Sequence, residues 1–349
     1  MQWETLRRSK KWLRLKGALF EIVVESFLRQ SGYRRIQPDG THIRKAELRG
    51  RGTWHQIDAF GGYKFGIPFL HEIRLISEAK CYSKKARLWV VRNFAGALKD
   101  ISENYFVERH VTDPETDLVT RYTDAGAVFS AKGFTLAAED YAYAQGIFLI
   151  SYENNPILGP VLKSMYKLID RLDIDRAAHD IGLFKEWIRS KMDLDHDYLS
   201  ADISFAKTNF DESFKDFNNR KMKIRTSYIA TATNMYPVHL LSLQQFPWDL
   251  FKERDDTPCQ IHFDAKRNYL TIVPTEDQTV TFHVSIPAEV FARYKDDMTV
   301  FKERFFQYVD IPAIQENGIR RTLQLRLDME WLAALRSQRL SQEMAIRGA

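Results

Sequence analysis

Cysteine is scarce in this chain. Only two cysteines, Cys81 and Cys259, occur among 349 residues, and they stand far apart with no metal-ligand spacing around them. This scarcity excludes a structural zinc site built from cysteines. It fits a protein of the reducing cytoplasm, which is the location we expect.

Long apolar runs and nucleotide-binding loops are also absent from the sequence. No uninterrupted apolar stretch approaches the length of a membrane span, and residues 1–16 lack the apolar block and cleavage site of a secretory signal. The patterns Gly-x-x-x-x-Gly-Lys-Ser/Thr and Gly-x-Gly-x-x-Gly do not occur, which excludes the common ATP and dinucleotide sites. With 44% apolar and 28% charged residues, the composition is that of an ordinary globular protein, and no membrane partner is expected.

One short stretch carries most of the chemical information. Asp58 lies in an apolar run that a Gly-Gly pair at 61–62 follows, and Glu78-Ala79-Lys80 ends a second apolar run. The glycines are expected to break the first strand so that a hairpin returns the second strand alongside it. Because side chains alternate along a strand, Glu78 and Lys80 project from one face. The sequence therefore predicts that two carboxylates and one ammonium converge.

These residue types suit the hydrolysis of a phosphodiester. Mg²⁺ prefers hard oxygen ligands and is commonly held by one or two carboxylates with water and substrate phosphate, which Asp58 and Glu78 can supply. The ion lowers the pKa of bound water and neutralises charge on phosphoryl oxygens, while Lys80 can hold a phosphate oxygen or the attacking water. The alternative is a solvated surface pair, because Glu-x-Lys occurs in many strands.

Further landmarks flank this stretch. Residues 17–28 have apolar side chains at helical spacing, and a Gly-Tyr pair at 32–33 ends this helix. Downstream, residues 126–130 indicate a buried strand, residues 134–144 a helix, and residues 146–150 a second buried strand. A strand, a helix and a strand in this order predict that the two strands pair in parallel.

The order of these landmarks resembles the Mrr-like restriction endonucleases of the PD-(D/E)xK nuclease superfamily. It runs from a Gly-x-x-Phe-Glu helix through Asp58 and the Glu-x-Lys strand to a Phe-Thr-x-x-Ala helix and a final strand, over residues 16–152. The resemblance implies an α/β fold, with a restriction-endonuclease-like mixed sheet flanked by helices. It also implies a DNA endonuclease of restriction or anti-phage defence that uses Mg²⁺, with Mn²⁺ as a substitute. By position, Asp58 and Glu78 would be the metal ligands and Lys80 the catalytic lysine.

Glu21 matches the glutamate on the first helix of this family, which can face the metal site, and it completes the expected catalytic set. The alternative is a solvated carboxylate near a helix N-terminus, where the helix dipole favours negative charge. The chain departs from the family at Glu78, where many members have Gln. Residues 107–124 are expected to form an insertion without an assigned role.

Basic residues are concentrated near the predicted site. Residues 1–100 contain 21 of the 51 Lys and Arg but 9 of the 46 Asp and Glu. Clustered cations attract nucleic acid through the release of counterions, with little regard for base sequence, so we expect DNA as a partner. The alternative is ordinary solvated surface. The candidate nucleic-acid-binding residues are Lys84, Lys85, Arg87, Arg92, Arg49 and Arg51.

Two domains are expected. Residues 1–155 would form the nuclease domain, with a basic helical arm at 1–16, and residues 156–349 an α+β accessory domain for target selection, dimerisation or partner docking. A homodimer is expected, because one site cuts one strand, and a defence-system protein is a further candidate partner. The expected elements of the second domain are helices at 157–172, 177–192 and 287–309, strands at 259–263, 269–273, 279–286 and 322–327, and a helix from 328.

Two rival functions stay open at this point. One is a nucleic-acid-binding module that retains a nuclease fold without hydrolysis, which the complete set of charged residues argues against. The other is an RNA-directed or structure-specific nuclease, because metal-assisted hydrolysis of a backbone does not itself distinguish DNA from RNA. Metal-dependent cleavage would distinguish the DNA endonuclease from the first rival. Competition between DNA and RNA substrates would distinguish it from the second.

Overall fold

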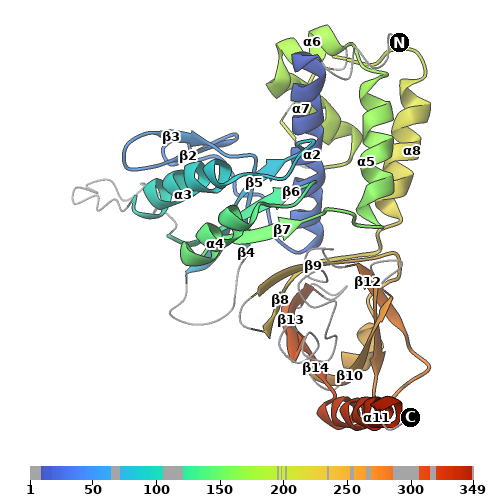
Figure 1. Cartoon of the computed structure of the whole chain (residues 1–349). Coiled ribbons are helices and arrows are strands. Elements are labelled where there is room, and N and C mark those ends of the chain that lie inside the picture. Colours follow the sequence, from blue (N-terminus) through green and yellow to red (C-terminus); the bar gives the residue numbers. More distant parts are fainter. Residues whose placement is uncertain are drawn as a thin grey trace. The chain divides into compact units, whose positions relative to one another are not determined.

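The structure, a computed structural model, describes residues 9–63, 71–104, 121–194, 196–197, 199–200, 203–233, 236–251, 255–264, 269–285, 306–314 and 320–347. Figure 1 shows its helices and strands, labelled where there is room. The chain forms two compact units, Met1–Ser151 with Met165–Asp211, and Tyr152–Ser164 with Glu212–Ala349. Within the described ranges, no helix is both long enough and apolar enough to cross a membrane.

The units do not follow the expected boundary at residue 155. The chain leaves the first unit after Ser151, returns to it at Met165 and leaves it again after Asp211. Helices α6 (Ile174–His179) and α7 (Ile181–Lys191), which were expected in the accessory domain, pack instead against α2 (Lys10–Gln30). Their apolar side chains are buried there, and the first unit is larger than the sequence predicts.

The first unit is built on a mixed four-stranded sheet. Its strands β5 and β6 pair in parallel, as do β6 and β7, while β4 pairs antiparallel with β5. The antiparallel return of the second strand and the parallel pairing downstream are both confirmed. The strands in their order across the sheet are β4 (Ala59–Tyr63), β5 (Glu72–Lys80), β6 (Tyr122–Ser130) and β7 (Phe148–Ser151).

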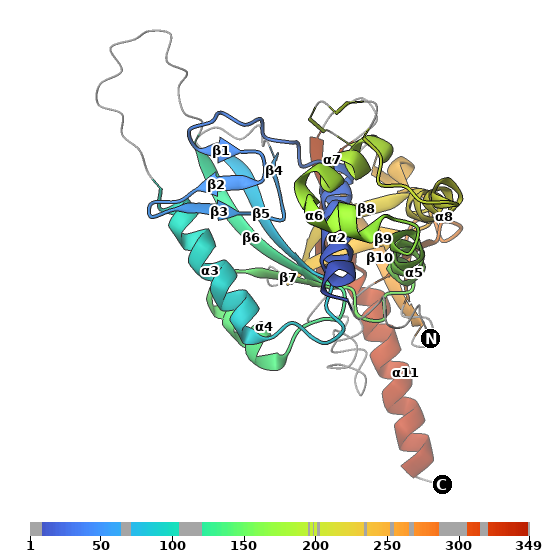
Figure 2. The same cartoon turned by 90° about the horizontal axis from the view of Figure 1, so that it is seen from above.

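Helices cover both faces of this sheet (Figure 2). A Cβ on Gly61 would lie 2.8 Å from the Arg29 guanidinium of α2, and one on Gly126 would lie 2.4 Å from Leu98 of α3 (Leu88–Ser102). The partners of these glycines on β5 are consecutive residues, so the glycines face opposite sides of the sheet. Helix α2 therefore lies on one face and α3 on the other, with α4 (Leu136–Ala144) packed against α3.

Helix α2 is longer than the expected helix over 17–28. Ser9 caps its N-terminus, because the Ser9 hydroxyl accepts a hydrogen bond from the Trp12 amide at 3.0 Å. Beyond its C-terminus Gly32 has φ +90°, a conformation that favours glycine. The expected arm at 1–16 is therefore not separate over 10–16, which form the first turns of α2; residues 1–8 lie outside the described residues.

The Gly-Gly pair at 61–62 does not break the strand, contrary to the expectation. Both glycines lie inside β4, where Arg34 and Gly62 exchange two backbone hydrogen bonds at 2.8 and 2.9 Å. Close approach of this neighbouring segment and of Arg29 explains why side chains are absent there. The break falls instead at 57–58, where the chain leaves a small sheet of β1 (Ile43–Arg44), β2 (Glu47–Arg49) and β3 (Trp54–Gln56).

The second unit contains a closed barrel of seven strands, which the α+β expectation did not anticipate. The barrel closes through parallel pairing of β10 with β14, and its other neighbours are antiparallel. Around the barrel the strands are β10 (Asp256–Asp264), β11 (Tyr269–Pro274), β12 (Phe282–Ser285), β9 (Tyr236–Ser242), β8 (Thr226–Ala232), β13 (Tyr308–Ile314) and β14 (Arg320–Leu327). The helical segments that belong wholly or partly to this unit are α5 (Leu158–Ile169), α8 (Phe210–Met222), η2 (Trp248–Phe251) and α11 (Met329–Arg347).

Several expected elements of this region are present in shifted form. Strands expected at 259–263, 269–273 and 322–327 lie within β10, β11 and β14, and the strand expected over 279–286 is limited to β12. The helix expected over 287–309 is wrong at its end, since residues 308 and 309 begin β13. Residues 287–305 of that helix lie outside the described residues, as do residues 107–120 of the expected insertion.

A buried hydrogen-bond network links the barrel to the residues before α5. His239 of β9 is 3% exposed, and its two ring nitrogens lie 2.6 Å from the Tyr152 hydroxyl and 2.8 Å from the Ser227 hydroxyl. Burial lowers the pKa of His239 to about 3, so the ring is neutral in the folded protein. The group has no exposed face, and we assign it to stability, as expected for a packed histidine.

Replacing His239 is expected to change how stability depends on pH. The unfolded chain binds a proton at His239 below its ordinary pKa of 6.5, whereas the folded chain does so only near 3. Stability should therefore fall as the pH falls from 6.5 towards 3, with His239 contributing at most about 1.4 kcal/mol per pH unit. Urea unfolding of His239→Gln between pH 4 and 7 should show a shallower slope than wild type. The same substitution at the exposed His283 is the control. Equal slopes for wild type and His239→Gln would contradict the assignment of His239 as a buried, neutral histidine.

Candidate active site

Asp58 stands where the chain passes from the small sheet into the main sheet. Before it, the Ile57 amide donates to the Ala46 carbonyl at 2.8 Å, and after it Ala59 pairs with Ser77 of β5. The backbone of residue 57 therefore does not continue the ladder with β5. The Asp58 carboxylate takes its place, because Oδ2 accepts a hydrogen bond from the Ala79 amide at 2.9 Å. This bond fixes the Asp58 side chain against the end of β5.

Lys80 brings the two carboxylates together. Its Nζ lies 3.3 Å from Asp58 Oδ2 and forms an ion pair with Glu78 Oε1. Glu78 and Lys80 are two residues apart on β5 and share a face, as the sequence predicts. All three side chains are largely buried, with 13 to 22% of each exposed. The predicted convergence of Asp58, Glu78 and Lys80 is thus present in the fold.

The cluster holds more negative than positive charge. Burial and the neighbouring Asp58 carboxylate raise the pKa of Glu78 to about 7, against the lowering effect of Lys80. Burial lowers the pKa of Lys80, but the charges of Asp58 and Glu78 outweigh burial and raise the pKa. One ammonium group is therefore paired with two buried carboxylates. Such a site favours a further cation or a proton.

Glu21 comes from the buried side of α2 and does not touch Lys80. Its Oε2 forms an ion pair with Nζ of Lys185 on α7, and both side chains are at most 15% exposed. Burial and the Asp58 charge raise the pKa of Glu21, and Lys185 opposes this effect. Glu21 is therefore close enough to the cluster to sense Asp58, but its direct partner is Lys185.

Lys185 is the residue near the site that the sequence did not reveal. It lies 164 positions after Glu21, on a helix that was expected in the other domain. One signal could have indicated a buried role. Lys185 stands among the apolar residues of α7 that are buried, beside Phe184, Trp187 and Ile188.

Replacing Lys185 with methionine should destabilise the protein by about 3 kcal/mol, because it leaves the Glu21 carboxylate buried without its cation. Chemical denaturation measures this loss. The double variant Glu21→Gln/Lys185→Met removes both charges and should recover most of the lost stability. If the double variant were no more stable than the single one, the ion pair would not be the reason for the loss.

The donor atoms of the cluster fit a hard divalent cation. Asp58 and Glu78 offer carboxylate oxygens, and the unbalanced negative charge on them would be relieved by a cation such as Mg²⁺ or Mn²⁺. Among the described residues, no group of three or more His, Cys, Asp or Glu side chains is arranged to hold a metal ion, since Glu21 is turned to Lys185. Two carboxylates with water and a substrate phosphate are nevertheless a common set for Mg²⁺.

The candidate nucleic-acid-binding residues lie at the surface in two groups. Lys84, Lys85 and Arg87 are exposed in the segment directly after β5, and Arg92 is exposed on α3. Exposed Tyr82 and Trp89 accompany them. The second group is on the small sheet: Arg49 lies over the Trp54 ring at 5.6 Å, and Arg51 forms an ion pair with Glu103.

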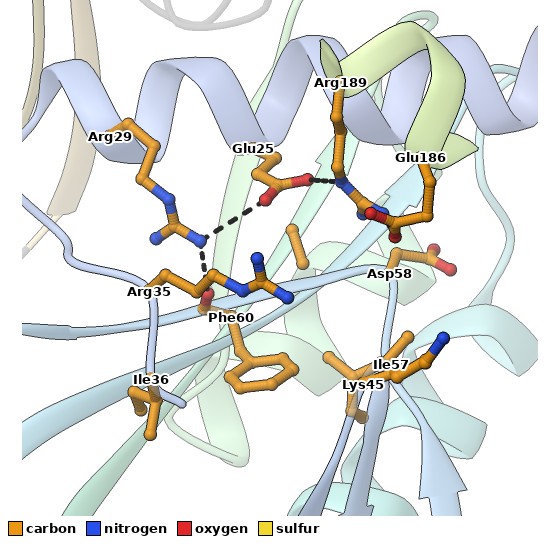
Figure 3. A pocket seen from close by; sticks show the side chains of 12 residues that line it. Glu25, Arg29, Arg35, Ile36, Lys45, Ile57, Asp58, Phe60, Glu186 and Arg189 are labelled. Carbon is orange, nitrogen blue, oxygen red and sulfur yellow. Dashed lines mark hydrogen bonds and ion pairs between the residues drawn. The ribbon is translucent and has the colours of Figure 1, made fainter. Parts of the chain in front are cut away.

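A charged pocket adjoins Asp58 (Figure 3). Arg189 of α7 bonds to Glu25 at 2.9 Å and to Glu186 at 2.6 Å, and Arg29 bonds to Glu25 at 3.4 Å. These contacts fix one wall of the pocket. The lining residues are Glu25, Arg29, Arg35, Ile36, Lys45, Ala46, Ile57, Asp58, Ala59, Phe60, Glu186 and Arg189.

Comparison with known proteins assigns no family to this chain. No protein-family model matches it, and no curated protein matches it. The chain has a weak similarity to a solved structure titled as the crystal structure of the protein of unknown function AF1548. The two share 12% sequence identity with a TM-score of 0.27, over 51% of this chain and 99% of that chain. This similarity carries no argument about fold or function.

Proposed function

We propose that the protein is a metal-dependent endonuclease of the PD-(D/E)xK type that hydrolyses phosphodiester bonds in DNA, in restriction or anti-phage defence. The observation that carries the proposal is the contact of one buried lysine with two buried carboxylates at the end of β5. The sheet order β4-β5-β6-β7, with α2 on one face and α3 on the other, is compatible with such a nuclease core. Mg²⁺ is the proposed cofactor, with Mn²⁺ as a substitute.

In this proposal Asp58 and Glu78 hold the ion, which when bound supplies charge neutralisation at the phosphate and a more acidic water. Lys80 holds a phosphate oxygen or orients the attacking water, and its raised pKa keeps it protonated for the first of these roles. The hydrogen bond from the Ala79 amide keeps Asp58 in place during this process. Glu21 acts at a distance, through its charge and through Lys185.

The exposed basic groups support a polyanionic substrate. Lys84, Lys85, Arg87 and Arg92 follow Lys80 closely in the chain, and a nucleic acid held there would release counterions. Arg49 and Arg51 would add contacts from the small sheet. Cleavage of both strands of a duplex by one site would need a second subunit or a second event, so we also propose a homodimer. A role of the second unit in target selection or in docking a defence partner belongs to the same proposal.

Incubation with labelled duplex DNA, single-stranded DNA and RNA, each with Mg²⁺ and with EDTA, tests the proposal. The expected result is cleavage of the duplex that requires Mg²⁺. Binding of all three substrates without cleavage would favour the rival non-hydrolytic module. Preferential cleavage of RNA or of single strands would favour the other rival and would overturn DNA as the substrate.

A further inference from the structure

One aspartate, Asp197, forms ion pairs with two basic side chains that line the pocket beside Asp58. Asp197 Oδ1 lies 3.1 Å from Arg35 Nη2, and its Oδ2 lies 3.1 Å from Lys45 Nζ. The Asp197 carboxylate therefore uses both oxygens on two cations from separate segments. Its backbone amide donates to Glu186 Oε2 at 2.9 Å, which holds the residue in position.

Arg35 and Lys45 face a pocket that Asp58 also lines. Figure 3 shows the Arg35 side chain from the segment after α2 and the Lys45 side chain from the turn between β1 and β2, together with Asp58, around this pocket. Any group bound by both cations would thus lie next to a proposed metal ligand. On a nucleic acid bound for hydrolysis, the nearest other anionic groups to the cleaved linkage are the neighbouring phosphates of the same backbone.

The two cations Arg35 and Lys45 favour an anion beside them. Glu25 and Glu186 already bond to Arg29 and Arg189, whereas Arg35 and Lys45 share the single carboxylate of Asp197. These two cations thus exceed their partner by one charge. A phosphate offers the same paired oxygen geometry as a carboxylate, and arginine binds both through parallel hydrogen bonds.

We infer that Arg35 and Lys45 form a binding site for a backbone phosphate of the nucleic acid, and that Asp197 occupies this site as an internal phosphate mimic until the substrate displaces it. This inference rests on the proposed nucleic-acid substrate. Displacement is feasible because the contact is partly open to solvent, with 35% of the Asp197 side chain and 76% of the Lys45 side chain exposed. Partly exposed ion pairs are weak enough for a bound polyanion to replace them.

Binding without hydrolysis tests the inference. Fluorescence anisotropy with a labelled DNA duplex in EDTA would compare wild type, Asp197→Ala, Arg35→Gln/Lys45→Gln and the triple variant over a range of salt concentrations. Asp197→Ala should tighten binding by about three- to tenfold, because the two cations no longer have an internal competitor. The salt slope of log K should become steeper by about 0.9 for each additional phosphate contact. In the Arg35→Gln/Lys45→Gln background, removal of Asp197 should have no such effect.

Asp175→Ala is the matched control, because Asp175 forms an exposed ion pair with Lys11 at 2.6 Å in the same unit, outside the Asp58 pocket. An effect of Asp197→Ala no larger than that of Asp175→Ala, or one that persists without Arg35 and Lys45, would overturn the inference. The readout does not depend on cleavage. Tighter binding by Asp197→Ala without cleavage in Mg²⁺ would support this inference and refute the nuclease. Cleavage in Mg²⁺ with unchanged Asp197→Ala binding would support the nuclease and refute this inference, and absence of binding in EDTA would refute this inference alone.

Discussion

Replacing Lys80 with alanine is expected to lower the rate of DNA cleavage by about a hundred- to a thousandfold, a loss typical of removing a group that stabilises developing charge. Lys80 is the cation in contact with both Asp58 and Glu78, so its removal takes away the group that would meet the phosphate or the water. Affinity for duplex DNA in EDTA should change by less than about threefold, because the exposed cations that attract the backbone are retained. Single-turnover cleavage and anisotropy measure the two quantities separately.

Lys99→Ala is the control for this experiment. Lys99 is an exposed lysine of α3 that faces Glu103. Its replacement by alanine removes a positive charge from the same unit without changing the cluster of Asp58, Glu78 and Lys80. Its cleavage rate should equal that of wild type. If Lys80→Ala also cleaved as fast as wild type in Mg²⁺, then Lys80 would have no part in the reaction and the assignment of the site would be wrong.

Replacing Glu78 with glutamine should weaken the binding of Mg²⁺ or Mn²⁺ by about ten- to a hundredfold, because one of the two charged oxygen donors is lost while size and shape are kept. The same change should not destabilise the protein in the absence of metal. Burial and repulsion from Asp58 already raise the pKa of Glu78 to about 7, so the charged form is disfavoured in the fold. Titration calorimetry with Mn²⁺ and thermal unfolding measure the two effects.

This combination distinguishes a metal ligand from a structural carboxylate. A structural ion pair should lose stability when Glu78 becomes glutamine, whereas a ligand set should lose affinity for metal and keep its stability. Glu103→Gln, at an exposed position on the same unit, should change neither quantity. Undiminished Mn²⁺ binding by Glu78→Gln would contradict the assignment of Glu78.

Local patterns predicted the centre of the site because short-range rules govern it. Alternation along β5 places Glu78 and Lys80 on one face, and the antiparallel return of β5 brings them to Asp58. The same rules gave α2 and the parallel strands β6 and β7. The Gly-Gly pair at 61–62 was misread because glycine also occurs where another backbone approaches a strand, and only the fold shows which reason applies.

The contribution of α7 could not be predicted, since it depends on contacts between residues far apart in the chain. Lys185 meets Glu21, and Asp197 meets Arg35, each across more than 160 positions. The barrel could not be predicted for a related reason. Its closure needs β10 to pair with β14, and no local pattern in either strand specifies that partner.

The dependence of the cleavage rate on Mg²⁺ is the most direct test of the central claim that Asp58, Glu78 and Lys80 form a metal-assisted hydrolytic site. Single-turnover cleavage of duplex DNA would be followed over a range of Mg²⁺ concentrations for wild type and Asp58→Asn. We expect a rate for wild type that rises with Mg²⁺ to saturation and is zero in EDTA, and no detectable cleavage by Asp58→Asn. Cleavage by wild type in EDTA, or equal rates for the two proteins, would contradict the claim.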